Sequence, residues 1–147
     1  MKRFEITNKK ASFNYEFKDT YIAGIVLNGA EISAIRDGRV NISESYCHFV
    51  GNELFLKNSV VTPKREHDTY TVKDYNRDRK LLLNKSELKK IYEQVKIKGM
   101  TVVPYKLFIN ERNMCKVVVA IASGKKTYDK RRDIKERDID RQSKREL

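Results

Sequence analysis

MTVVPYKLFINERNMCKVVVAIA, residues 100–122, is the stretch that decides the fold. It holds two runs rich in Val, Ile, Tyr and Phe, Met100–Ile109 and Met114–Ala122, joined by the polar segment Asn110–Asn113. Because β-branched and aromatic residues favour strands, the stretch predicts two long neighbouring strands of a closed sheet. Pro104 cannot donate a ladder hydrogen bond, so its position inside the first run predicts an edge or a bulge there.

Shorter strands are predicted upstream. From residue 13 to residue 18, aromatic side chains at Phe13, Tyr15 and Phe17 alternate with polar ones, which is the pattern of a half-buried strand. The other predicted strands are Tyr21–Leu27, Ser45–Val50, Glu53–Leu56 and Arg79–Leu83. Between the second and third of these, Gly51 and Asn52 predict a tight hairpin turn.

Two helices are predicted between the strands. The short segment Glu31–Arg36 has an acid at its start and a base at its end, as the helix dipole favours. A clearer helix follows Asn84, which can cap it together with Glu87 and is followed by the stripe Leu88, Ile91, Tyr92 and Val95, with Gly99 as its end. The polar stretch Thr62–Asp78 lacks periodicity and is expected to be a long surface loop.

These elements predict a mainly β chain: a small antiparallel β-barrel of about six strands with two interspersed helices. Barrels of this kind often bind single-stranded or irregular nucleic acid. The 147 residues suffice for one such domain and a short appendage. We therefore expect a domain over residues 1–123 and a tail over residues 124–147.

The net charge limits the classes of partner that the protein is expected to bind. The chain has 32 Lys and Arg against 20 Asp and Glu, a formal net charge of +12. A positive excess of this size is best tolerated beside a polyanion. Charge alone does not decide whether that partner is nucleic acid, an anionic membrane or an acidic protein. No apolar run is long enough to cross a bilayer, and no signal peptide is recognised, so a cytoplasmic location is expected. Cys47 and Cys115 are then interpreted as small core residues rather than a disulfide.

No catalytic pattern stands out. His48 and His67 are the only histidines and lack ligand-type neighbours at zinc spacing. Cys47 and His48 are adjacent, so on a strand they would point to opposite faces and could not form a nucleophile–base pair. Carboxylate pairs that could hold magnesium, such as Asp68 with Asp74, fall in a loop or a charge run. We expect no enzyme activity, cofactor, metal or small-molecule substrate.

The tail is too polar to form a core. Ten Lys and Arg and six Asp and Glu fall within its 24 residues. Pairs such as Asp133 with Arg137 would support a helix by only about 0.2 to 0.5 kcal/mol each, so order is expected only on a partner. Ile134 and Ile139 do not make the broad apolar face of a membrane-surface helix. A solubilising tail and a functional one remain open from composition.

Five strings in order resemble the SsrA-binding protein family, also called small protein B, the bacterial partner of transfer-messenger RNA (tmRNA). They are NKKA (Asn8–Ala11), TYIAGIVLNGAEISAIR (Thr20–Arg36), SESY (Ser43–Tyr46), RDRKLLLNK (Arg77–Lys85) and GKKTYDKR (Gly124–Arg131). Each is weak alone, but their shared order across nearly the whole chain is specific.

The resemblance implies an oligonucleotide-binding-like (OB-like) barrel with two or three helices and a basic tail. It implies that one face of the barrel holds the tRNA-like domain of tmRNA. It also implies that the tail enters the decoding region and the vacant messenger channel of the small ribosomal subunit. Such a protein rescues stalled ribosomes by trans-translation, and we expect it to be monomeric. A structural ribosomal protein with a basic extension is the alternative.

The resemblance also suggests which residues contact tmRNA. Leu82 is expected to point opposite to Leu81 and Leu83, toward an unstacked base or beneath the long loop. For Glu31 and Arg36, a surface charge that complements the helix dipole is an equal possibility. The full expected set is Asn8, Lys9, Lys10, Glu31, Arg36, Arg79, Lys80, Leu82, Lys125 and Lys126.

In the tail, the resemblance suggests a ribosome-binding segment. Basic groups would neutralise phosphates, and the ring of Tyr128 could stack on rRNA bases at about 1 to 3 kcal/mol per base. The expected set is Tyr128, Asp129, Lys130, Arg131, Ile134, Lys135 and Arg137. The chain departs from the family pattern at Ile22, where an acid is frequent, and at Val72 and Lys73, where Asn-His is frequent. No RNA contact is carried over to these three positions.

Overall fold

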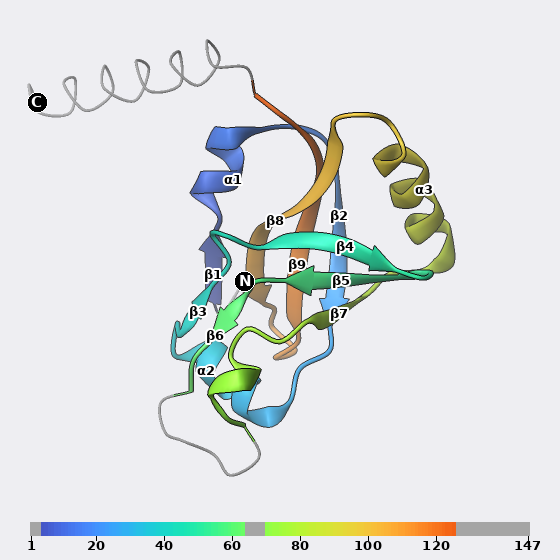
Figure 1. Ribbon diagram of the computed structural model, residues 1–147. Coiled ribbons are helices and arrows are strands. Elements are labelled where there is room, and N and C mark those ends of the chain that lie inside the picture. Colours follow the sequence, from blue (N-terminus) through green and yellow to red (C-terminus); the bar gives the residue numbers. More distant parts are fainter. Residues whose placement is uncertain (1–3, 64–69, 126–147) are drawn as a thin grey trace, which may run out of the picture.

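The computed structural model describes residues 4–63 and 70–125, and its main feature is an antiparallel sheet that closes on itself (Figure 1). The sheet runs in the order β1-β8-β4-β5-β7-β2-β9, and an additional pairing of β9 with β8 closes it. Six of its strands therefore form a closed ring, to which β1 is added on β8. The strands are β1 (Phe4–Thr7), β2 (Tyr15–Ile25), β4 (Tyr46–Val50), β5 (Glu53–Lys57), β7 (Arg79–Leu82), β8 (Met100–Ile109) and β9 (Cys115–Gly124).

Three long strands form the frame of the ring. β9 pairs along its whole length with β8 on one side and β2 on the other. The β8–β9 register shifts between Pro104 and Lys106, which is the bulge predicted from the proline. The β2–β9 register shifts between Phe17 and Asp19. These irregularities let long strands bend around a small core.

The core fills the inside of the ring. Alternate residues of β9 point inward and are fully buried, together with Leu54 and Leu56 from the facing strand β5. Those of β9 are Val117, Val119 and Ile121. Because successive side chains point to opposite faces, Ala120 and Ala122 lie outside the ring and form a second buried cluster with Ala11.

Helix α1 (Lys9–Asn14) covers that second cluster through Ala11. Asn8 caps the helix, since its side-chain oxygen accepts from the Ala11 N–H at 3.1 Å. This helix was not predicted: the strand expected from Phe13 begins only at Tyr15, and β2 then continues to Ile25 without a break. Six residues give too little periodicity to reveal a helix, and the packing of α1 on small alanines decides its conformation.

Both predicted helices are present. α2 (Gly29–Arg36) and α3 (Lys85–Val95) each begin with a full capping box, Asn28 with Glu31 and Asn84 with Glu87. On α3, Ile91 is fully buried and Leu88 and Val95 pack on the core, as the stripe predicted. Tyr92 is the exception, because 44% of its surface is exposed.

The predicted mainly β fold with about six ring strands and two or three helices is therefore confirmed, with three α-helices among the described residues. Met100–Ile109 is correct at both ends, and Gly51 has the positive φ of the predicted hairpin turn. Besides α1 and β1, the two-residue strands β3 (Val40–Asn41) and β6 (Val60–Val61) and the 3-10 turn Val72–Asp74 inside the long loop were not predicted. Elements this short carry no pattern of their own.

Candidate RNA interface

A buried ion pair joins α2 to β7. The Arg79 Nε donates to Glu31 Oε2 at 2.7 Å, and neither side chain has any exposed surface. Glu31 also accepts from Arg77 Nε at 3.1 Å and from the backbone N–H of Asn28 at 3.0 Å. The carboxylate is thus saturated by hydrogen bonds, which is what makes a buried charge tolerable.

Arg79 uses its remaining donors to hold two loops. Nη1 donates to the carbonyl and hydroxyl of Ser59, at 3.1 and 2.9 Å. Nη2 donates to the hydroxyl of Tyr70 at 3.1 Å and to the carbonyls of Asp74 and Tyr75 at 3.2 and 3.0 Å. The guanidinium therefore fixes the described part of the long loop against the ring.

These contacts set the ionisation of Glu31. Burial pushes the pKa of Glu31 upward, but the hydrogen bonds from Arg77 and Asn28 and the charge of Arg79 together outweigh it, so the pKa lies below its ordinary value of 4.5. The carboxylate is ionised at neutral pH. Its charge is neutralised inside the protein.

The expectation that Glu31 and Arg79 contact RNA is at odds with this placement. Neither side chain offers exposed surface to a ligand, because each is the other's internal partner. Asn8 is also 97% buried, capping α1 and donating its amide to the carbonyls of Ile42 and Pro104 at 2.9 and 3.0 Å. These three residues therefore stabilise the fold through internal hydrogen bonds.

The neighbouring lysines are exposed. Lys9 and Lys10 follow Asn8 on α1, and Lys10 forms an ion pair with Glu44 of the SESY string. Tyr46, at the end of that string, is 42% exposed. Lys10, Glu44 and Tyr46 line one groove together with Tyr15 and Ser45. The structure thus brings two strings together that are more than 30 residues apart in the chain.

A second set of residues, some exposed and some half-buried, crosses three neighbouring strands. Gly24 of β2 pairs with Leu82 of β7 on one side and with Lys116 of β9 on the other. Leu82 is 50% exposed whereas Leu81 is buried, so the predicted outward direction of Leu82 is confirmed. A Cβ on Gly24 would lie only 3.3 Å from Leu82 Cβ and 3.7 Å from Lys116 Nζ. The absent side chain of Gly24 leaves Leu82 and Lys116 close together.

Lys116 is not among the residues predicted from the sequence to contact RNA. The signal available was one lysine within an otherwise apolar strand, Cys115–Ala122, but only the cross-strand register places it beside Leu82. Ile22 lies on the same strand as Gly24, two residues away, and is 61% exposed. We call Ile22, Gly24, Leu82 and Lys116 the β7–β2–β9 face. It combines apolar surface with a cation, as unstacked bases and phosphates require.

The other expected tmRNA contacts are dispersed. Lys80 pairs with Glu53 at 2.9 Å on the outside of the ring. Arg36 is exposed at the end of α2 beside Phe4 and Asn113. Lys125 follows β9, with its N–H donating to the Asn14 carbonyl at 2.9 Å. Lys126 and the expected tail contacts Tyr128, Asp129, Lys130, Arg131, Ile134, Lys135 and Arg137 lie outside the described residues.

The cysteines match their interpretation as structural residues. Cys47 and Cys115 are both free; Cys47 is buried inside β4, and His48 points outward from the same strand. Burial raises the pKa of Cys47 far above its ordinary value and that of Cys115 to about 12. Within residues 4–63 and 70–125, no cluster of three or more metal-ligating side chains is found, and no helix is long and apolar enough to span a membrane.

Comparison with known proteins places these features in a family. A family model described as SmpB protein matches residues 5–147. The SsrA-binding protein of Phocaeicola vulgatus is 52% identical over 133 residues, covering 90% of this chain and 88% of the relative. That of Flavobacterium johnsoniae is 48% identical over 141 residues, covering 96% and 93%.

A solved structure agrees with the sequence matches. It is described as "tmRNA-SmpB: a journey to the center of the bacterial ribosome" and superimposes with a TM-score of 0.69. The two chains are 40% identical, and the match covers 84% of this chain and 85% of the solved one. The likeness therefore extends over the described fold and is supported by sequence at the same time.

Proposed function

The chain belongs to the SmpB family of SsrA-binding proteins, and from this premise we propose that it is the RNA-binding adaptor of trans-translation. It binds the tRNA-like domain of tmRNA and brings tmRNA to stalled ribosomes, where the nascent peptide is tagged. The observation that carries this proposal is the match of the SmpB model to residues 5–147, which includes both the ring and the tail.

The β7–β2–β9 face is the surface we assign to the tRNA-like domain. Leu82 supplies exposed apolar area, Lys116 supplies a cation, and Gly24 leaves the space between them. RNA loops offer unstacked bases beside phosphates, and this face matches both parts of that chemistry. The exposed lysines of α1, Lys9 and Lys10, would add phosphate contacts at a second point.

The buried residues Glu31 and Arg79, which were expected to bind RNA, would act indirectly by fixing the strand that carries Leu82. Arg79 precedes Leu82 on β7 by three residues, and its internal contacts with Glu31 and Ser59 fix that strand. A strand held in this way keeps its outward side chains in a set direction. Glu31 and Arg79 are therefore positioning residues for the face.

The tail forms the second working part. We divide the chain into an RNA-binding domain, residues 1–123, and a basic segment, residues 124–147, that enters the decoding region and the empty messenger channel. Ten Lys and Arg in that segment suit a path lined by rRNA phosphates. Because binding and positioning suffice for this role, we propose that the protein is not catalytic. The role would place it in the cytoplasm with the ribosomes.

Binding to the isolated tRNA-like domain tests the proposal. In gel-shift or filter assays at about 0.15 M salt, the protein should prefer this domain over bulk tRNA, because purely electrostatic binding would not discriminate between them. Equal binding to both RNAs would overturn the proposal. Stable retention on washed ribosomes without tmRNA would instead favour a structural ribosomal protein.

A further inference from the structure

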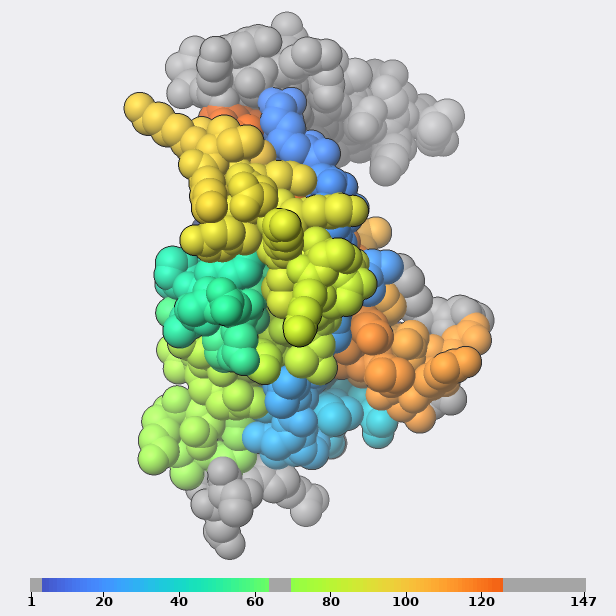
Figure 2. Space-filling view, turned by 90° about the vertical axis from the view of Figure 1, so that its right-hand side faces the viewer, coloured from blue at the N-terminus to red at the C-terminus, as the bar shows by residue number. Residues whose placement is uncertain are grey.

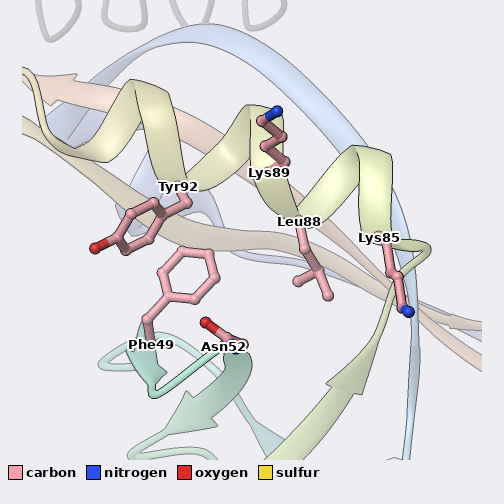
Figure 3. A pocket seen from close by; sticks show the side chains of 6 residues that line it. All are labelled: Phe49, Asn52, Lys85, Leu88, Lys89 and Tyr92. Atoms are coloured by element: carbon pink, nitrogen blue, oxygen red, sulfur yellow. The ribbon is translucent and has the colours of Figure 1, made fainter.

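An aromatic groove lies between α3 and the β4–β5 hairpin. Figure 2 shows these two elements side by side on one face of the molecule. The groove is lined by Phe49 and Asn52 from the hairpin and by residues of one face of α3 (Figure 3). Those residues are Lys85, Leu88, Lys89 and Tyr92, spaced as i, i+3, i+4 and i+7.

Two rings form one wall of the groove. Phe49 and Tyr92 meet edge to face, with centroids 5.4 Å apart and planes at 86°. Tyr92 keeps 44% of its surface exposed even though it is on the face of α3 that is turned toward the protein. An aromatic surface that the fold leaves half open is suited to stack with a further planar group.

Lysine side chains lie along the groove and beside one of its rings. Lys85 and Lys89 lie on the groove, and Figure 3 shows their ammonium groups turned away from the rings. Neither forms an ion pair with any residue that the structure describes. Lys96 lies over the Tyr92 ring, 4.6 Å from its centroid.

The acids of α3 do not compensate these charges. Glu87 is occupied by the capping box, accepting from the Asn84 N–H at 3.2 Å. Glu93 pairs with Lys96 at 3.6 Å, at the far end of the helix from Lys85. The groove therefore joins exposed aromatic surface, uncompensated positive charge and one amide, Asn52.

We propose that this groove binds an unstacked base of a single-stranded RNA segment, with Lys85 and Lys89 neutralising the flanking phosphates. Stacking platforms beside cations are how proteins hold single strands, and the Asn52 amide can donate to or accept from a base edge. The inference goes beyond the proposed function, because it concerns single-stranded RNA and residues other than the β7–β2–β9 face. It requires a basic protein that meets RNA, and in that respect rests on the proposed function.

Photocrosslinking separates this groove from the rest of the basic surface. An unstructured RNA oligonucleotide that carries 4-thiouridine is mixed with the unaltered full-length protein and irradiated, and the crosslinked residues are identified by mass spectrometry. Crosslinks should form saturably at residues of the groove, Phe49, Asn52 and Tyr92, and only at background level in the exposed segment around Arg112. Crosslinks that are absent from the groove, or no more frequent there than around Arg112, would overturn the proposal.

Ring and charge are then tested in the same assay. Tyr92→Ala should raise the RNA concentration for half-saturation by about 5- to 150-fold, the equivalent of one stacked base. Tyr92→Phe keeps the ring and should bind as the parent does. Replacing Lys85 and Lys89 by Gln should lower the slope of log affinity against log salt by about 0.7 per lysine.

Lys90→Gln provides the matched control, since Lys90 is an exposed lysine of the same helix outside the groove. An equal loss in Lys90→Gln and Lys89→Gln, or an unchanged half-saturation in Tyr92→Ala, would refute the groove. Binding of each variant to the tRNA-like domain is measured in parallel. Failure of the parent protein to prefer that domain would count against the proposed function alone.

Discussion

The carboxylate of Glu31 and the guanidinium of Arg79 lie 2.7 Å apart with no exposed surface on either side chain. The two residues are 48 positions apart in the chain, one on α2 and the other on β7. Their pair connects the helix, the ring and the long loop. Its removal should therefore affect the whole fold, and through the fold the RNA-binding face.

Arg79→Met should lower the free energy of unfolding by about 3 to 5 kcal/mol, because the buried carboxylate of Glu31 loses its fully buried cationic partner and the hydroxyls of Ser59 and Tyr70 each lose a donor. Urea denaturation measures the change. Lys80 is the next residue on the same strand and is only half-buried, so Lys80→Met should change the free energy of unfolding by about 0.5 kcal/mol or less. Similar losses in the two variants would contradict the internal role of Arg79.

The same pair predicts a pH dependence. The folded-state pKa of Glu31 is depressed below 4.5, so the folded protein binds fewer protons here than the unfolded chain. The stabilisation is full above pH 4.5 and is lost as the pH falls through the lower folded-state pKa. The stability difference between the parent and Glu31→Gln should therefore shrink on acidification from about pH 7 to about pH 3. A difference that stays constant over this range would rule out the depressed pKa.

Leu82→Ser should weaken binding to the tRNA-like domain by roughly 5-fold, because burying the exposed half of this side chain against a base is worth about 1 kcal/mol. Because half of Leu82 is exposed, the free energy of unfolding should change little. The matched control is Val72→Ser, an exposed apolar residue of the long loop for which no RNA contact is expected. Filter binding compares the three proteins, and a loss in both variants would argue against the β7–β2–β9 face.

Lys116→Gln should also weaken binding to the tRNA-like domain, and it should change the salt dependence of the affinity. Removing one phosphate contact lowers the slope of log affinity against log salt by about 0.9. Lys57→Gln is the control, since Lys57 lies on another strand and its charge is paired with Asp78 at 3.6 Å. A salt slope unchanged by Lys116→Gln would exclude a phosphate at this position.

Deleting Thr127–Leu147 should leave binding to the tRNA-like domain largely intact but end tagging, because domain and tail address different partners. Tagging is measured with stalled ribosomes in a reconstituted translation system, and RNA binding by filter assay on the same protein. A parallel loss of both activities would place the tail on the tmRNA-binding surface.

How much of the fold and of the candidate site could be predicted depends on how far apart the interacting residues lie in the sequence. The helices α2 and α3 were predictable because a capping box involves residues three positions apart. The outward direction of Leu82 followed from strand alternation alone, and the bulge in β8 from Pro104. Such features are local, and they suffice for a mainly β ring with helices.

Tertiary structure alone decided which polar residues are inside. Nothing near Glu31, Arg79 or Asn8 in the sequence shows that each will be buried, because each also depends on a partner tens of residues away, such as Arg79 for Glu31 and Ile42 for Asn8. Lys116 lies beside Leu82 only because of the register of three strands. Phe49 contacts Tyr92 only because the β4–β5 hairpin packs on α3. Burying a charge depends on distant partners that compensate its desolvation, and stacking depends on where separate elements pack. The sequence by itself thus determined the longer elements and the family, whereas the folded chain decided which residues support the surface and which are free to bind RNA.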